Sequence, residues 1–294
     1  MIVILTALQQ EHKAVRQHLT DVRTHRHSAG TLFEVGVLAG HPDRRVGLAV
    51  TGEGNARAAT ITERAINEFR PAAVLFVGIA GGLHDWLGLG DVVVATRVYG
   101  YHGGSSREEG FKARPRAWDS SHELDQVARH VDRTDTWRSA ISGAPGVHFC
   151  PIAAGEVLLE SVASDVTKQL DEHYNDAVAV EMESAGVAQA SHLNLSTPAI
   201  TIRGISDHAD RTKRFTDQQG VPRLAAEHAA AFAAAVIAEI VDTDEEADHD
   251  GKGGKEERQF HIKNEAKGNA KVIAQIGVVH GGVQFGTPAG EGGS

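Results

Sequence analysis

Two carboxylates and a thioether stand side by side directly after a short apolar run. Glu181, Met182 and Glu183 follow residues 178–180, an expected strand, and precede residues 184–190, whose small side chains predict a helix. In open α/β sheets, ligands bind at the carboxyl ends of the strands. Carboxylates accept hydrogen bonds from neighbouring hydroxyls, and methionine packs on the apolar face of a ribose. The pattern therefore suits a sugar, although glutamates are also favoured in the first turn of any helix.

Three further segments fall at the ends of expected strands. They are residues 7–11, which contain Glu11, residues 78–82, which read Gly-Ile-Ala-Gly-Gly, and residues 203–210, which contain Asp207. The glycines would let the backbone approach a flat ligand closely. Each segment has a simpler alternative, because Glu11 suits a first helical turn and Asp207 could cap a helix. Their common place at strand ends is where a site would be built.

Alternating strands and helices must position these segments. The expected strands are residues 1–6, 32–38, 45–51, 72–77, 91–99, 147–152, 178–180 and 199–204, and the expected helices are residues 10–19, 56–69, 122–131, 161–170, 184–190 and 223–241. Residues 101–121 are polar and contain glycine, so we expect a loop there. This order predicts an α/β domain around a parallel or mixed sheet.

Composition excludes several classes of function. The 294 residues carry a formal net charge of −10, whereas nucleic-acid binding needs a basic face. The single Cys150 permits no intramolecular disulfide, and the 17 histidines contain no His-Glu-x-x-His motif. No dinucleotide or P-loop motif is present, so we expect neither metal nor cofactor. The chain opens on an apolar run without a basic leader, and residues 229–238 are too short an apolar run for a bilayer, so we expect a cytoplasmic protein without membrane contact.

The α/β pattern stops near residue 241. We expect a catalytic domain over residues 1–241, a charged linker over residues 242–260 and a disordered, low-complexity tail over residues 261–294. Within the tail, residues 264–286 are β-prone, lack proline and carry little charge after Lys271, which are the ingredients of cross-β stacking.

Together the four segments resemble the nucleoside phosphorylase/nucleosidase superfamily, and most closely its methylthioadenosine/S-adenosylhomocysteine nucleosidases. The resemblance covers residues 1–241, and its specific part is Val-Glu-Met-Glu at 180–183 followed by Ser-Asp-His-Ala-Asp at 206–210. It implies a three-layer domain with a central mixed sheet flanked by helices. It also implies cleavage of the N-glycosidic bond between a purine and its ribose.

The resemblance assigns roles to individual residues. Asp207 would protonate the departing base at N7, Ser206 would orient Asp207, and Glu11 and Arg203 would place the attacking water. The substrate-binding residues would be Glu181, Met182 and Glu183 at the sugar, with Ala80, Gly81, Leu158 and Leu159 at the base. We favour hydrolysis over the alternative, phosphorolysis, because the Glu11 carboxylate would repel phosphate.

Three departures bear on the substrate. Ile79 replaces a hydroxyl that contacts water in the hydrolases, and Leu158 replaces the usual phenylalanine over adenine, which puts small thio-nucleosides in doubt. The expected loop also carries four cations, Arg107, Lys112, Arg114 and Arg116, which could hold a 5′-phosphate chain or form a solvated surface.

Two alternatives therefore stay open beside the nucleosidase. The first is an effector that acts on purine nucleotides such as ATP and is activated through tail-driven assembly. The loop resembles that of nucleosidases attached to signalling modules, and residues 264–286 resemble amyloid signalling motifs of multicellular bacteria. A non-catalytic nucleoside-binding module is the second. The family resemblance implies a homo-oligomer, and the tail resemblance implies a signalling partner that shares the motif.

Overall fold

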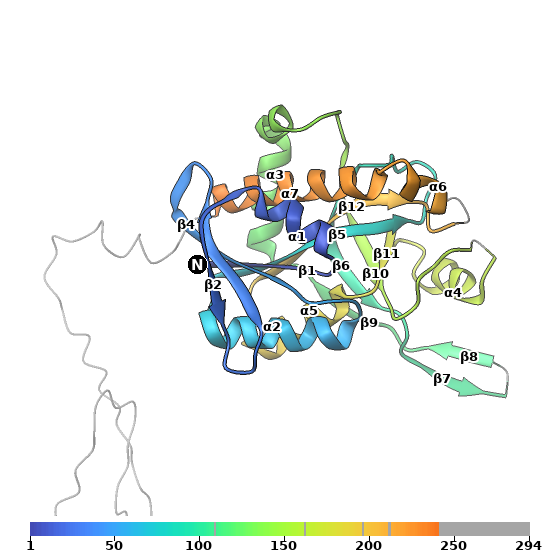
Figure 1. Ribbon diagram of the computed structural model, residues 1–294. Coiled ribbons are helices and arrows are strands. Elements are labelled where there is room, and N and C mark those ends of the chain that lie inside the picture. Colours follow the sequence, from blue (N-terminus) through green and yellow to red (C-terminus); the bar gives the residue numbers. More distant parts are fainter. Residues whose placement is uncertain (109, 162, 196, 211–212, 241–294) are drawn as a thin grey trace, which may run out of the picture. The chain divides into compact units, whose positions relative to one another are not determined.

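A computed structural model describes residues 1–240 of the chain, except residues 109, 162, 196 and 211–212 (Figure 1). The predicted linker, tail and motif at 264–286 lie outside the described residues. The family boundary that we placed near residue 241 stays a prediction.

The described residues form a large mixed sheet that contains both parallel and antiparallel strand pairs. Its main path runs β11-β10-β6-β12-β5-β1-β4-β3-β2, and β9 pairs with β6. The strands are β1 (Ile2–Thr6), β2 (Leu19–Arg26), β3 (Leu32–Leu38), β4 (His41–Val50), β5 (Ala73–Gly82), β6 (Val92–Gly100), β9 (Arg116–Asp119), β10 (Val147–Ala154), β11 (Ala179–Glu181) and β12 (Ala199–Asp207). This confirms the predicted mixed sheet.

Part of the sheet closes on itself. Strand β11 pairs in parallel with β10 and also antiparallel with β5, so β5, β12, β6, β10 and β11 form a ring. At the end of this ring Gly81 lies opposite Val180 on β11 and opposite Asp207 on β12. Closure therefore brings the three predicted strand-end segments of β5, β11 and β12 together.

Helices cover both faces of the sheet. The helices are α1 (Gln9–Arg16), α2 (Asn55–Phe69), α3 (His122–Thr134), α4 (Asp165–His173), α5 (Ser184–Leu193), α6 (Lys213–Gln218) and α7 (Val221–Glu239), with a short 3₁₀ helix at Thr136–Ala140. Helices α1, α3 and α7 share one apolar cluster with the sheet, and α2 and α5 share another (Figure 1). The three-layer architecture is confirmed.

Helix α7 is the apolar core helix of this fold. Among the described residues it alone is long and apolar enough to cross a membrane by length and composition. Eleven of its 19 residues are buried, including Phe232, Val236 and Ile237. Its alanines let it lie close to the sheet, because a short side chain reduces the distance between backbones.

Several sequence-based boundaries were wrong for physical reasons. Strand β2 was missed: Leu19 was placed in the expected helix at 10–19 and residues 20–26 received no assignment, because the exposed residues of this strand hide the alternation on which strand prediction depends. The glycine-rich residues 78–82 continue β5 as a strand, because β11 and β12 pair with them. Residues 101–121 are not a loop: they contain β9 and the hairpin of β7 (Gly104–Arg107) and β8 (Gly110–Ala113), which projects from the domain (Figure 1).

The packing of α7 on β12 predicts a sharp stability effect at Gly204. A Cβ there would overlap the carbonyl oxygen of Ala225, a backbone atom that cannot rotate away. We expect Gly204→Ala to lower the free energy of unfolding by about 1–3 kcal/mol in urea titrations. As a control, a Cβ on Gly82 would meet its nearest atom, on Ile205, at an ordinary 3.4 Å. Equal losses for the two variants would contradict this packing.

Candidate active site

A cavity of about 120 Å³ opens where the strand-end segments meet. It brings together ten residues predicted from sequence, namely Glu11, Ala80, Gly81, Leu158, Leu159, Glu181, Met182, Glu183, Ser206 and Asp207. Arg203 does not line this cavity and lies buried beside it. A second cavity of about 420 Å³ shares Leu8, Glu53, Ile79 and Leu158 with the first and continues toward α6 and α7.

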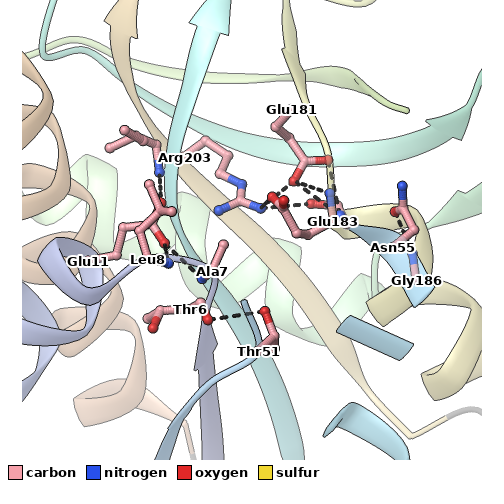
Figure 2. A network of polar contacts seen from close by, with 12 residues as sticks. Thr6, Ala7, Leu8, Glu11, Thr51, Asn55, Glu181, Glu183, Gly186 and Arg203 are labelled. Atoms are coloured by element: carbon pink, nitrogen blue, oxygen red, sulfur yellow. Dashed lines mark hydrogen bonds and ion pairs between the residues drawn. The ribbon is translucent and has the colours of Figure 1, made fainter. Parts of the chain in front are cut away.

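Glu11 is fixed by backbone donors on two sides. The amides of Ala7 and Leu8 donate to its Oε2 at 2.8 Å, and the amide of Ile79 donates to Oε1 at 2.8 Å (Figure 2). Burial raises the pKa of this carboxyl, and the Arg203 guanidinium and these amides partly offset that rise. The side chain is thus held rigidly between the end of β1 and β5.

Arg203 is the buried cation of the site. Its Nη2 forms an ion pair with Glu181, lies 3.9 Å from Glu183 Oε2 and donates to Ser184 Oγ at 3.3 Å. Its guanidinium carbon lies 4.0 Å from the centre of the Phe76 ring. Figure 2 shows the guanidinium between Glu11 on one side and Glu181 and Glu183 on the other.

The other end of the guanidinium faces Gly78. Arg203 Nε and Nη1 have no hydrogen-bond partner among the described residues. A Cβ on Gly78 would overlap both Arg203 Nη1 and Glu11 Oε1. Only glycine therefore leaves room on β5 for the two side chains, which explains one glycine of the Gly-Ile-Ala-Gly-Gly segment.

The two glutamates after β11 differ in their surroundings. Glu181 accepts bonds from the amides of Glu183 and Ser184 as well as from Arg203, so its carboxylate positions the start of α5. Glu183 Oε1 accepts from the Gly54 amide at 3.0 Å. Burial and the neighbouring Glu181 raise the pKa of Glu183 to about 7. Glu183 is the carboxylate with free acceptor capacity toward the cavity.

Asp207 is held at the end of β12. Ser206 Oγ donates to its Oδ2 at 2.7 Å, and the Ala209 amide donates to Oδ1 at 2.9 Å. The residue is only 2% exposed. A Cβ on Gly81 would lie 3.1 Å from Asp207 Oδ1, so glycine leaves space beside this carboxyl.

The four basic residues that we considered as contacts for a 5′-phosphate lie outside the two cavities. Arg107 and Lys112 are on the hairpin, Arg114 follows it, and Arg116 begins β9. None of them lines either cavity described above. Among the described residues, no group of three or more His, Cys, Asp or Glu side chains is arranged to hold a metal ion.

Sequence reasoning missed the contribution of the loop before α2. Glu53 lines both cavities, the Gly54 amide holds Glu183, and the Asn55 side chain bonds to Gly155, Glu156 and Gly186. No sequence pattern gave residues 52–55 a role in the site. Their link to residues a hundred or more positions away has no local sequence signal.

Comparison with known proteins places the chain in a family. The Phosphorylase superfamily model matches residues 1–238, so the chain belongs to this superfamily. A 5′-methylthioadenosine/S-adenosylhomocysteine nucleosidase of Bacillus cereus (strain G9842) is 29% identical over 252 residues, covering 81% of this chain and 99% of the relative.

Solved structures agree on the fold. The 5′-methylthioadenosine/S-adenosylhomocysteine nucleosidase of Neisseria meningitidis, solved with methylthio-immucillin-A, is 27% identical with a TM-score of 0.69, covering 81% of this chain and 99% of that one. The futalosine hydrolase of Helicobacter pylori, at 24% identity and a TM-score of 0.68, covers 81% and 97% respectively and shares the fold.

The buried ion pair predicts that the stability of the fold depends on Glu181. The side chains of Arg203 and Glu181 are 0% and 3% exposed, so removing one charge leaves the other poorly compensated. We expect Glu181→Gln to lower the free energy of unfolding by about 3 kcal/mol in urea titrations. The exposed pair of Lys168 and Asp165 is the control, and Asp165→Asn should cause no measurable change. Equal effects of the two substitutions would contradict the buried pair.

Proposed function

We propose that this site hydrolyses the N-glycosidic bond of an adenine nucleoside. Among the carboxyl groups that line the cavity, three belong to residues at or just after the ends of three different strands, namely Glu11 after β1, Glu183 after β11 and Asp207 at the end of β12, and this observation carries the proposal. Breaking this bond requires a proton for the base, stabilisation of a cationic sugar and a nucleophile for it. The 5′-methylthioadenosine/S-adenosylhomocysteine nucleosidase relatives support the same reaction.

Asp207 acts on the base in this proposal. Its protonated carboxyl would donate to N7 of the purine, which makes the purine a better leaving group. The Ser206 hydroxyl and the Ala209 amide fix both oxygens, so the carboxyl is oriented before the substrate binds. The backbone of Ala80 and Gly81 and the side chains of Leu158 and Leu159 form the base side of the cavity.

The sugar and the water occupy the opposite part of the cavity. Glu183 accepts hydrogen bonds from the ribose hydroxyls, and Met182 packs on the ring. Glu11 orients the water and takes up its proton, and burial keeps the pKa of this carboxyl raised, as a general base requires. Arg203 Nη1, which faces Glu11 across Gly78, supports the placement of the water.

The charges favour water over phosphate as the nucleophile. Glu11, Glu181 and Glu183 surround a single guanidinium, Arg203. When the three carboxyls are ionised, they and the guanidinium together carry a net negative charge. This charge would repel a phosphate dianion in the cavity. We therefore propose that the protein is a hydrolase. Phosphorolysis is the alternative reaction, and a phosphate-dependent release of base would indicate it.

A nucleotide-cleaving effector is the second candidate. It is favoured by the cations on the hairpin and directly after it, because Arg107, Lys112, Arg114 and Arg116 form no ion pair with a described residue. The homo-oligomer that the family resemblance implies, the signalling partner that the tail resemblance implies and a cytoplasmic location stay predictions.

Base release from a panel of substrates tests the function. We expect adenine from methylthioadenosine, S-adenosylhomocysteine or adenosine, measured by liquid chromatography without phosphate. Asp207→Asn should reduce turnover about 100- to 10,000-fold, because the amide cannot supply the proton. The matched control is Asp171→Asn on α4, outside both cavities. Adenine from ATP alone would select the effector instead, and equal turnover of Asp207→Asn and wild type would indicate a different chemistry.

The raised pKa of Glu183 predicts a pH dependence. Because this pKa is raised to about 7, Glu183 is protonated at lower pH and cannot accept from both ribose hydroxyls. We expect kcat/KM to rise with pH up to about 7 and then to level off on this limb. Glu183→Gln should remove the limb and lower kcat/KM at pH values near and above 7, where wild-type Glu183 is ionised. An unchanged limb in Glu183→Gln would assign the titration to another group.

A further inference from the structure

We propose that Asn55 is a positioning residue that sets the spacing between the base side and the sugar side of the cavity. This inference rests on the proposed function. Asn55 is the first residue of α2 and does not line the cavity. It would therefore act on the substrate only through the two segments that its side chain joins.

The side chain of Asn55 uses its donor and its acceptor in different directions. Its Nδ2 donates to the carbonyl of Gly155 at 2.6 Å and to Glu156 Oε1 at 2.9 Å. Its Oδ1 accepts from the amide of Gly186 at 2.9 Å (Figure 2). Only a primary amide has this combination of donors and acceptor on one short side chain.

Each bonded segment leads directly to one side of the cavity. Gly155 and Glu156 precede Val157, Leu158 and Leu159, which line the cavity on the base side. Gly186 lies in the first turn of α5, directly after the sugar-side Glu183. The residue before Asn55 completes the link, because the Gly54 amide donates to Glu183 Oε1.

The segments that Asn55 joins are closely packed at two glycines. A Cβ on Gly186 would overlap the carbonyl oxygen of Asn55, and a Cβ on Gly155 would overlap the Tyr101 ring. The Gly155 amide also donates to the carbonyl of Glu181 at 3.0 Å. Asn55 thus closes a continuous set of hydrogen bonds from the base segment to the carboxylate that would hold the ribose.

This arrangement makes a specific prediction for Asn55→Asp. The carboxylate keeps the bond to the Gly186 amide, loses the bond to the Gly155 carbonyl and repels Glu156. An acidic residue in the first turn favours the helix, so α2 should remain folded. We expect KM for the nucleoside and Kd for adenine to rise about tenfold, which corresponds to about 1.4 kcal/mol, with kcat changed less than KM.

The chain offers a rescue variant and a matched control. Adding Glu156→Gln to Asn55→Asp restores a donor opposite the new carboxylate, and this double variant should recover most of the adenine affinity. Asn67→Asp on the same helix is the control, because Asn67 also donates to a carbonyl and a carboxylate, both from Glu63, on an exposed turn. The control should leave KM and Kd unchanged.

The measurements distinguish a positioning role of Asn55 from a loss of folding stability, and they do so independently of the proposed reaction. Weaker adenine binding by Asn55→Asp at an unchanged melting temperature, with recovery in the double variant, would support the role of Asn55. Unchanged KM and Kd, or no recovery in the double variant, would overturn it. A wild-type protein that binds adenine but releases no base would instead overturn the proposed function, since the Kd series does not depend on turnover.

Discussion

A fully buried guanidinium is the constraint on which the site depends. Arg203 has no exposed surface, and a charge in such a place must be compensated by nearby anions and by hydrogen bonds. The compensation comes from Glu181 and Glu183 at the end of β11 and from Glu11 at the start of α1. Three segments that are distant in sequence are therefore held around one charge.

The closed part of the sheet makes this arrangement geometrically possible. Pairing of β11 with β5 turns five strands into a ring, and glycines at positions 78 and 81 leave room at its end for charged side chains. The same geometry gives the carboxyl groups different surroundings. All four line the cavity, but Glu181 also accepts bonds from Arg203 and from the first turn of α5, so Glu183, Glu11 and Asp207 are the carboxyl groups proposed to act on the substrate. One set of acidic residues can thereby serve structure, sugar binding and proton transfer.

Much of the fold could be predicted from sequence because the buried strands are apolar and short helices follow them. This pattern predicted an α/β domain around a parallel or mixed sheet and the carboxyl-end position of residues 181–183, whereas the three layers were implied by the family resemblance. Strand β2 could not be found, since its side chains are mostly exposed and show no clear alternation. The hairpin at β7 and β8 was hidden because glycine and charged residues are also typical of loops.

The sequence identified the candidate catalytic residues of the site better than the residues that position them. Glu11 and Asp207 stand in local patterns at strand ends, whereas Asn55 is defined by bonds to Gly155 and Gly186, which only the folded chain brings near. In the same way, the partnership of Arg203 with Glu181 depends on ring closure rather than on spacing. Family resemblance supplied the roles, and the structure supplies the contacts on which those roles would depend.

The nature of the sugar product tests the proposed chemistry most directly. The reaction of the wild-type protein with an adenine nucleoside would be followed by ³¹P nuclear magnetic resonance in saturating inorganic phosphate, with adenine quantified in parallel. Hydrolysis predicts complete release of adenine with no new phosphorus signal, because the carboxylates around Arg203 exclude phosphate and admit water. A ribose 1-phosphate signal equal in amount to the released adenine would contradict this proposal and make the site a phosphorylase.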